Sequence, residues 1–477
     1  MMEAAVAFGL FGTTKEEAPV PVPLVGVRAE ADIVGGGARV DLTQTFENRE
    51  TVAVEAVYRF PLPESAALTG FRARVGDRVV MGRVEERDRA FDEYDRALEE
   101  GHGAFLLDQE RPNVFTLSVG NLPPGGRAEI TLTYVEVLEA DGTDLRFRLP
   151  TTISPRYVPG DMDDEDGVPP GERVHPPYAD EVPYGLTLEI RVHGRDALEA
   201  LESPTHPVRV AMAGDPVRVE FSSERAAMDR DFVLTVRRRE GLPSAAWLVE
   251  GEGEAFVQAD LVLPRDDARD LPHEIVFLLD CSGSMMGSSI EQAKRALRIL
   301  LRALPAGVRT NLYRFGSTHE AVWPEPRPAD PKAVEELVSR LDAVDADLGG
   351  TEILRPLREI VERPLPDGAR RDVILLTDGE VANERAVAKV AGSYPGRVRV
   401  FAVGIGHGPN DFLIRETARA SGGASAVVAP GERIEPRVLG LFGKVLGTSV
   451  TGLRIKGGPG REQAPTEATG FGGGRVV

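Results

Sequence analysis

From residue 273 onward, short and almost wholly apolar segments alternate with amphipathic ones, and this alternation constrains the fold more than any other feature. Segments 275–279 and 373–376 contain only apolar residues, as is typical of central strands in a parallel sheet covered on both faces. Further strands are expected at 310–315 and 398–403. The segments between and after these strands predict helices by their apolar spacing of three and four, at 289–304, 332–342, 352–363, 410–420 and 434–446. A doubly wound, Rossmann-like α/β domain is therefore expected over 273–447.

Oxygen-bearing side chains follow the ends of two of these strands and precede a helix. Asp280, Ser282 and Ser284 come directly after the first apolar strand, and Asp378 directly after the strand around 373–376. Thr351 follows two glycines in a loop. Ligands of open α/β sheets bind outside the carboxyl ends of the strands. Two carboxylates and three hydroxyls are hard donors, so the predicted occupant is Mg²⁺ (or Mn²⁺).

This constellation resembles the metal-ion-dependent adhesion site (MIDAS) of von Willebrand factor A domains, and the resemblance covers 273–447. All five motif positions are filled. The resemblance implies that Ser282, Ser284 and Thr351 are direct ligands, whereas Asp280 and Asp378 often act through water. It also implies one open coordination position, which an aspartate or glutamate of a partner protein fills.

The region 20–158 is predicted to be β-rich with one helix near 85–100. Three short segments carry the sequences Phe-Asp-Glu-Tyr (91–94), Asn-Val-Phe (113–115) and Asn-Leu-Pro-Pro-Gly (121–125). With these segments, the region resembles the vault/inter-alpha-trypsin (VIT) domain. A VIT domain followed by an A domain is the arrangement of inter-alpha-trypsin inhibitor heavy chains and their bacterial relatives.

Three further segments complete the expected multidomain organisation. An acidic and proline-rich linker is predicted at 159–183, and a flexible C-terminal tail at 461–477. Between the linker and the A domain, 184–270 is β-rich and resembles part of a β-sandwich. If 449–460 adds a strand to it, the A domain is an insertion in a β domain.

Charge and cysteine content exclude several classes of function. The chain has 76 acidic and 56 basic residues, for a net charge of −20, whereas nucleic-acid binders carry a basic footprint. No run approaches the ~18 apolar residues of a membrane span. Cys281 is the one cysteine, which excludes an internal disulfide framework and fits a reducing compartment. The apolar stretch 4–11 follows Glu3 rather than a basic start, so it is a poor signal peptide, and a cytoplasmic location is expected.

The leading hypothesis is a non-enzymatic, divalent-cation-dependent protein–protein interaction module whose metal recruits a partner carboxylate. The alternative is a structural subunit of a multi-protein assembly, in which the metal only stabilises the A domain. A metal-dependent hydrolase is disfavoured because the motif segments offer no histidine or glutamate positioned as a general base. A Cys281 nucleophile is disfavoured too, because that residue lies between two proposed ligands.

Overall fold

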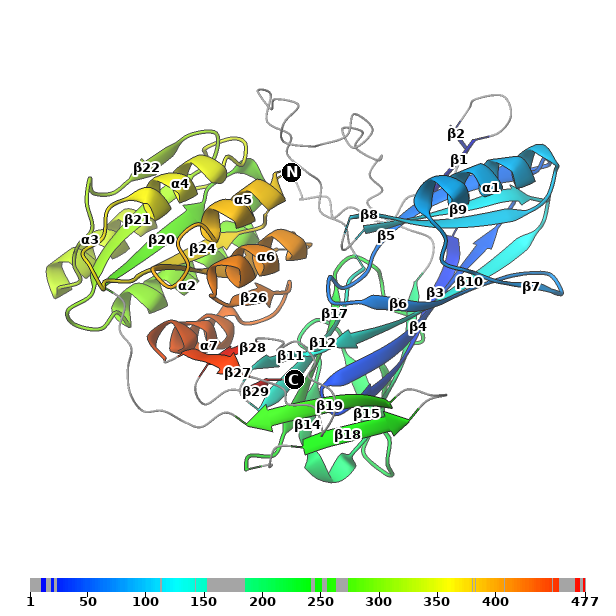
Figure 1. Ribbon diagram of the computed structural model, residues 1–477, viewed down its shortest axis with the longest axis horizontal. Helices are drawn as coiled ribbons and strands as arrows, with labels where there is room; N and C mark the ends of the chain where they lie inside the picture. The colour runs from blue at the N-terminus through cyan, green and yellow to red at the C-terminus, as the bar shows by residue number, and fades with distance from the viewer. Residues whose placement is uncertain are drawn as a thin grey trace, which may run out of the picture. The chain divides into compact units, whose positions relative to one another are not determined.

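The structure is a computed structural model that describes most of the chain. The described residues are 10–13, 19–20, 24–111, 114–141, 143–151, 185–241, 245–250, 255–262, 273–379, 381, 383–406, 408–447, 449–453, 468–471 and 475–476. The chain forms two compact units, one made chiefly of 243–477 and the other of 2–153 with 176–242 (Figure 1). The predicted linker at 159–183 and most of the predicted tail at 461–477 lie outside the described residues.

An eight-stranded sheet dominates the N-terminal unit, with strand order β15-β16-β13-β3-β4-β10-β6-β7. Every neighbouring pair is antiparallel except β13 and β3, which run parallel. Its strands are β3 (Leu24–Val34), β4 (Gly37–Glu47), β6 (Ala67–Val75), β7 (Arg78–Met81), β10 (Arg127–Val137), β13 (Leu186–Val192), β15 (Val208–Ala211) and β16 (Val217–Phe221). Alternate residues of β13 are buried, as expected where one sheet face packs on a core.

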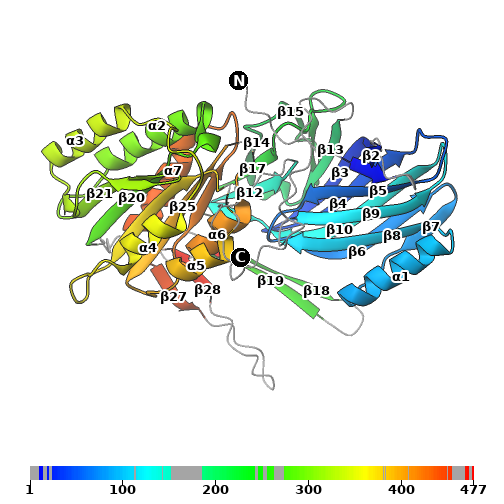
Figure 2. The ribbon, with the colours of Figure 1, turned by 90° about the horizontal axis from the view of Figure 1, so that it is seen from above.

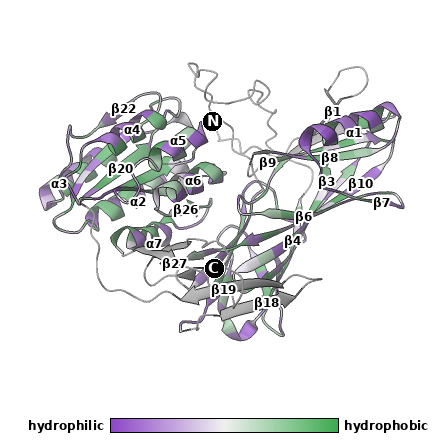
Figure 3. Cartoon of the chain, in the orientation of Figure 1, coloured by the Kyte–Doolittle hydropathy of each residue, from purple (hydrophilic) through white to green (hydrophobic). Residues whose placement is uncertain are grey.

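Two smaller sheets share the core of this unit, which includes Val40, Leu117 and Phe147 from three different sheets. The five-stranded sheet, in order β2-β1-β5-β9-β8, comprises β1 (Leu10–Thr13), β2 (Pro19–Val20), β5 (Val54–Pro61), β8 (Ala104–Arg111) and β9 (Val114–Leu122). The four-stranded sheet, in order β11-β12-β17-β14, comprises β11 (Glu139–Asp141), β12 (Asp144–Leu149), β14 (Leu198–Glu202) and β17 (Phe232–Arg238), with the 3₁₀ turn η3 (Arg195–Ala197) preceding β14. The expected helix is α1 (Arg87–Glu99), which is largely hydrophilic (Figure 3) and buries Tyr94.

Strand pairing differs from the expected division of the chain at 159–183. Strand β13 pairs with β3, and β17 pairs with β12, so the stretch after residue 184 supplies strands to sheets that begin before residue 158. The predicted boundary at 159–183 therefore does not separate the strands before it and after it into different sheets. The physical reason is that pairing between distant strands is set by tertiary packing, which the local sequence pattern does not encode.

The end of the predicted 184–270 segment also pairs differently from the expectation. Strands β18 (Ala245–Glu250) and β19 (Ala255–Val262) form a hairpin, and β19 pairs with β29 (Arg475–Val476). Strand β27 (Ser449–Leu453) pairs with β28 (Ala468–Phe471). Among the described residues, the segment 449–453 therefore does not complete the 184–270 stretch, and 454–460 lie outside them.

The second unit contains the predicted α/β domain, and the doubly wound fold is confirmed. Its sheet has the order β22-β21-β20-β24-β25-β26, with β23 also beside β21, and β21, β20, β24, β25 and β26 are parallel. The strands are β20 (Glu274–Asp280), β21 (Arg309–Phe315), β22 (His319–Ala321), β23 (Arg327–Pro328), β24 (Arg371–Thr377), β25 (Val398–Ile405) and β26 (Ser425–Val428). The helices are η4 (Gly283–Met285, a 3₁₀ turn), α2 (Ser288–Arg302), α3 (Pro331–Asp342), α4 (Leu354–Glu362), α5 (Glu384–Ala391), α6 (Asp411–Ser421) and α7 (Ile434–Leu446).

Helices cover both faces of this sheet (Figure 2). Ile275, Phe277 and Leu279 of β20 belong to a core with α2, α3 and α7, whereas Val276 and Leu278 belong to a second core with α4, α5 and α6. Adjacent β20 residues thus face opposite layers, which explains the uninterrupted apolar run. Among the described residues, no helix combines the length and apolarity needed to cross a membrane.

Candidate metal site

The proposed ligands lie where the order of the parallel strands reverses. The chain leaves β20 for β21 on one side of it and later returns to β24 on the other side. Leu279 of β20 is in register with Leu376 of β24. Asp280 is the last residue of β20 and Asp378 directly follows β24, so both lie at the carboxyl ends of two adjacent strands. This topological switch point is the usual ligand site of open α/β sheets.

A tight turn after β20 gathers three of the predicted ligands. The backbone N–H of Ser282 donates to Oδ1 of Asp280 at 2.9 Å, and the hydroxyl oxygens of Ser282 and Ser284 are 3.0 Å apart. The 3₁₀ turn η4 then begins, with Met285 N donating to the carbonyl of Ser282 at 3.1 Å. The side chains of Ser282 and Ser284 are thereby brought to one side of the turn. Asp280 and Ser282 are buried, and Ser284 is half-buried.

The loop that carries Thr351 is docked on this turn through the backbone. Gly283 N donates to the carbonyl of Gly349 at 2.7 Å, and Leu348 N donates to the carbonyl of Cys281 at 3.0 Å. Gly349 has φ of 78°, a left-handed conformation that favours glycine. Thr351, two residues later, is 3% exposed. The backbone therefore links the third motif segment to the first.

Two carboxylates at the site repel one another. Complete burial, together with the charge of Asp378, raises the pKa of Asp280 to about 7. The hydroxyl of Thr377 donates to Oδ2 of Asp280 and accepts from Gly379 N, the latter at 2.8 Å. Asp280 is therefore oriented through both carboxylate oxygens, and a cation beside it would offset the repulsion.

The donor set fits a hard dication. It consists of carboxylates and hydroxyls, which Mg²⁺ and Mn²⁺ accept. Across the described part of the chain, there is no group of three or more His, Cys, Asp or Glu side chains that could hold a metal. Burial and the charge of Asp280 raise the pKa of Cys281 to about 12, which disfavours its thiolate at neutral pH.

Sequence reasoning did not identify two residues that hold the site in place. Thr377 orients Asp280, and its position as the polar residue that ends the apolar run 373–376 could have revealed it. Asn410 donates its backbone N–H to the carbonyl of Asp378 at 2.9 Å, and its side chain caps α6 by accepting from Leu413 N at 3.1 Å. A cap residue is recognisable from sequence, but its contact with Asp378 depends on the fold.

Two family models match this chain. The model described as vault protein inter-alpha-trypsin domain matches residues 24–134, and the one described as von Willebrand factor type A domain matches residues 273–427. A solved von Willebrand factor type A structure from Catenulispora acidiphila is 19% identical, with a TM-score of 0.33 over 45% of this chain and 48% of that one.

Curated relatives match across most of the chain. Human von Willebrand factor A domain-containing protein 5A is 33% identical over 446 residues, which is 88% of this chain and 56% of the relative. The mouse protein of the same name is 31% identical over 98% of this chain and 62% of its own length. Human protein mono-ADP-ribosyltransferase PARP4 is 29% identical over 84% of this chain but only 23% of its own length. The chain thus spans little more than half the length of the first two relatives, and it combines a vault protein inter-alpha-trypsin domain with a von Willebrand factor type A domain.

Proposed function

We propose that this chain is a non-enzymatic protein-binding module that works through a divalent cation. Asp280, Ser282, Ser284, Thr351 and Asp378 would hold Mg²⁺ (or Mn²⁺), and the ion would recruit an aspartate or glutamate of a partner protein. The observation that carries the proposal is the buried Asp280 beside Asp378 at the switch point, with the Ser282 and Ser284 hydroxyls 3.0 Å apart.

Charge balance supports a carboxylate as the ligand of the bound ion. Two aspartates neutralise a dication, and the hydroxyls add no formal charge, so the ion keeps its affinity for one more anionic oxygen. The ion would be the largest local charge at the site. It would therefore attract a carboxylate even though the chain has a net charge of −20.

The chemistry of the site supports binding rather than catalysis. The Cys281 thiol stays protonated, and the carboxylate of Asp280 is engaged by Thr377 and by the backbone of Ser282. A cytoplasmic location also remains our proposal, on the grounds given from the sequence.

Titration calorimetry with Mg²⁺ and Mn²⁺ is the first test. We expect one dication per chain, and at least tenfold weaker binding after Asp378→Asn, since a buried carboxylate ligand is worth more than ~1.4 kcal/mol. The matched control is Asp367→Asn, at an exposed loop position of the same domain, which should bind as the wild type does. Equal affinity of wild type and Asp378→Asn would overturn the proposal.

The Mn²⁺-loaded protein then tests carboxylate recruitment. A glutamate-containing peptide should displace water from bound Mn²⁺ and lower its water-proton relaxivity, whereas the matching glutamine peptide should not. If removal of the metal lowers the thermal midpoint but the peptide leaves the relaxivity unchanged, the alternative of an assembly subunit with a purely stabilising metal is correct.

A further inference from the structure

We propose that strand β7 is a dimerisation edge, at which two copies of this chain join by antiparallel pairing of β7 with β7. Strand β7 is the terminal strand of the eight-stranded sheet, so its outer edge has no strand partner within the described residues. Soluble proteins usually protect such edges with charges, prolines or bulges. Strand β7 is short and begins with the charged Arg78, but it also exposes Val79 by 55%, Val80 by 42% and Met81 by 68%.

The backbone of β7 is arranged to accept another strand. Gly82 N donates to the carbonyl of Phe71 at 2.8 Å, so the backbone groups of Gly82 point toward β6. Hydrogen-bonding direction alternates along an antiparallel strand. Val80 therefore also points toward β6, whereas the N–H and C=O groups of Val79 and Met81 point outward, where a further strand would bind.

The sequence around β7 is complementary to itself in one register. If Val80 lies on a two-fold axis, Val79 of each copy lies opposite Met81 of the other. In the same register Asp77 of each copy lies opposite Arg83 of the other. Residues whose backbone N–H and C=O groups point away from β6 are thereby paired with each other, as antiparallel hydrogen bonding between the two strands requires. Two opposite-charge pairs flank the apolar centre. Asp77 and Arg83 are exposed.

Neighbouring registers lack this complementarity. A shift that places Met81 on the axis sets Asp77 opposite Glu85, which is repulsive. A shift that places Val79 on the axis sets Asp77 opposite Met81, with no cation facing it. A shift by one residue would set an outward-facing residue against an inward-facing one. Because a two-fold interface uses the same patch on both copies, this self-complementary pattern favours a second copy over a different protein.

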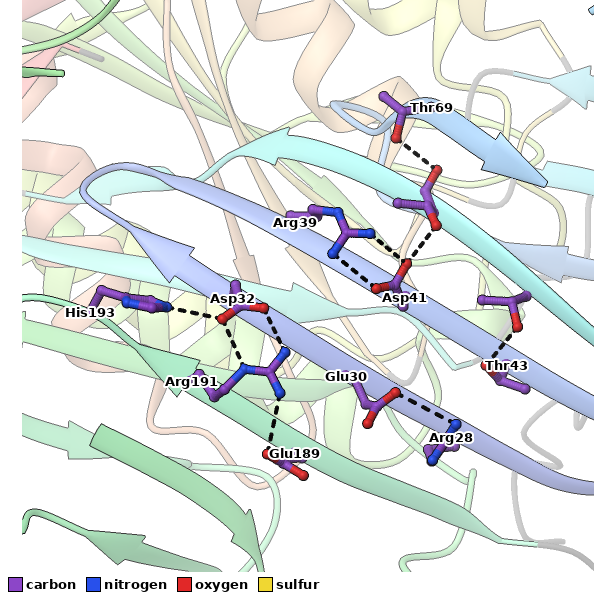
Figure 4. Close-up of polar contacts among 12 residues, drawn as sticks. Arg28, Glu30, Asp32, Arg39, Asp41, Thr43, Thr69, Glu189, Arg191 and His193 are labelled. Carbon is purple, nitrogen blue, oxygen red and sulfur yellow. Dashed lines mark hydrogen bonds and ion pairs between the residues drawn. The ribbon is translucent and has the colours of Figure 1, made fainter. Parts of the chain in front are cut away.

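Pairing of β7 with β7 would bring apolar side chains together on both faces of the joined sheet. Met81 and Val79 are in register with Arg72 and Arg74 of β6, so they share one face of the sheet, and Val80 lies on the other. Elsewhere in the same sheet charged side chains pair across strands, as Arg191 does with Asp32 (Figure 4). The aliphatic side chains of β7 would therefore gain cross-strand apolar neighbours from a second β7, which would cover part of their exposed surface.

Sedimentation equilibrium of the full chain tests the proposal. We expect a reversible monomer–dimer equilibrium for the wild type. Met81→Pro removes an outward N–H without removing a β6–β7 hydrogen bond, so it should give a monomer. Val79→Lys should also give a monomer, whereas Ala211→Lys, an exposed position on the opposite edge strand β15, should leave the dimer unchanged. Hydrogen exchange of β6 amides in the monomeric variants checks that the sheet remains folded.

Charge reversal tests the register. Asp77→Arg alone should weaken the dimer about tenfold, since it turns two attractive cross-strand pairs into repulsive ones. Adding Arg83→Asp should restore wild-type affinity. Arg83 also pairs with Glu93 within the chain, so Asp77→Arg is the cleaner single change. A wild type that stays monomeric up to on the order of 100 µM, a dimer that survives Met81→Pro, or a double variant no better than Asp77→Arg would overturn the proposal.

Discussion

Thr377 shows how one hydroxyl can connect two of the motif segments. It donates to Asp280 at the end of β20 and accepts from the backbone N–H of Gly379, just after β24, so it links the carboxyl ends of two adjacent strands. All three groups are buried. A buried donor or acceptor that loses its partner costs about 1–3 kcal/mol, which makes this residue a sensitive probe of the site.

Thr377→Val should lower the free energy of unfolding of the A domain by about 1–3 kcal/mol and weaken Mg²⁺ binding, because Asp280 loses its orienting donor. The matched control is Thr310→Val. The hydroxyl of Thr310 is buried without a hydrogen-bond partner within the described structure, so this change should leave stability unchanged or raise it. Thermal midpoints with and without Mg²⁺ measure both effects. A Thr377→Val protein as stable as Thr310→Val would contradict the assigned role.

Sequence reasoning could propose the five candidate ligands because three of them are closely spaced at the end of one apolar strand and because the full set resembles the adhesion-site motif. It could place Asp280 and Asp378 at strand ends because the preceding runs are apolar. It could not find the Thr377 hydrogen bond or the Asn410 backbone contact. Both depend on the register between β20 and β24 and on the approach of the loop before α6, which arise from packing.

At the scale of elements, the pairing of β13 with β3 joins two distant parts of the chain. Arg191 of β13 donates to both carboxylate oxygens of Asp32 of β3, at 2.9 and 2.6 Å, and His193 lies 3.0 Å from Asp32 (Figure 4). The Arg191 hydrogen bond, with a smaller contribution from His193, lowers the pKa of Asp32 from 3.8 to about 2. The ion pair therefore stabilises the folded unit only while Asp32 is ionised.

Asp32→Asn should destabilise the N-terminal unit at neutral pH by about 0.5–1 kcal/mol, a range that allows for solvent screening of a partly exposed pair. Because the folded-state pKa is depressed, the contribution is fully present above the unfolded value of 3.8 and is lost as pH falls toward 2. Urea unfolding at pH 7, 5 and 3 should show the wild-type advantage shrinking only at the lowest pH. Glu199→Gln, an exposed change on β14, is the control, and an advantage independent of pH would refute the linkage.

Elements of the α/β domain were easier to predict than the sheets of the N-terminal unit. Fully apolar strands and amphipathic helices carry their own periodic signal, so β20, β24, α3 and α7 fall close to their predicted ranges. Helix α5 (Glu384–Ala391) was missed because eight residues give too short a periodic pattern. Helix α2 begins at Ser288, one residue before its expected start, and Gly287 occupies the cap position.

At the scale of the whole molecule, the chain joins a VIT domain to a von Willebrand factor type A domain, as the sequence motifs predicted. The strands that follow the predicted linker could not be assigned correctly, since β13 adds to a sheet begun before residue 158. The two units offer separate surfaces for two proposals: a cation site on the A domain, and the β7 edge on the N-terminal unit. Each can fail without the other.

Diffraction from crystals grown with Mn²⁺ tests the cation site most directly. The account predicts one anomalous peak among Asp280, Ser282, Ser284, Thr351 and Asp378, with hydroxyl oxygens at roughly 2.0–2.2 Å and at least one position held by water or an added carboxylate. Saturating Mn²⁺ that gives no peak there, or a peak bound by a different set of side chains, would contradict it.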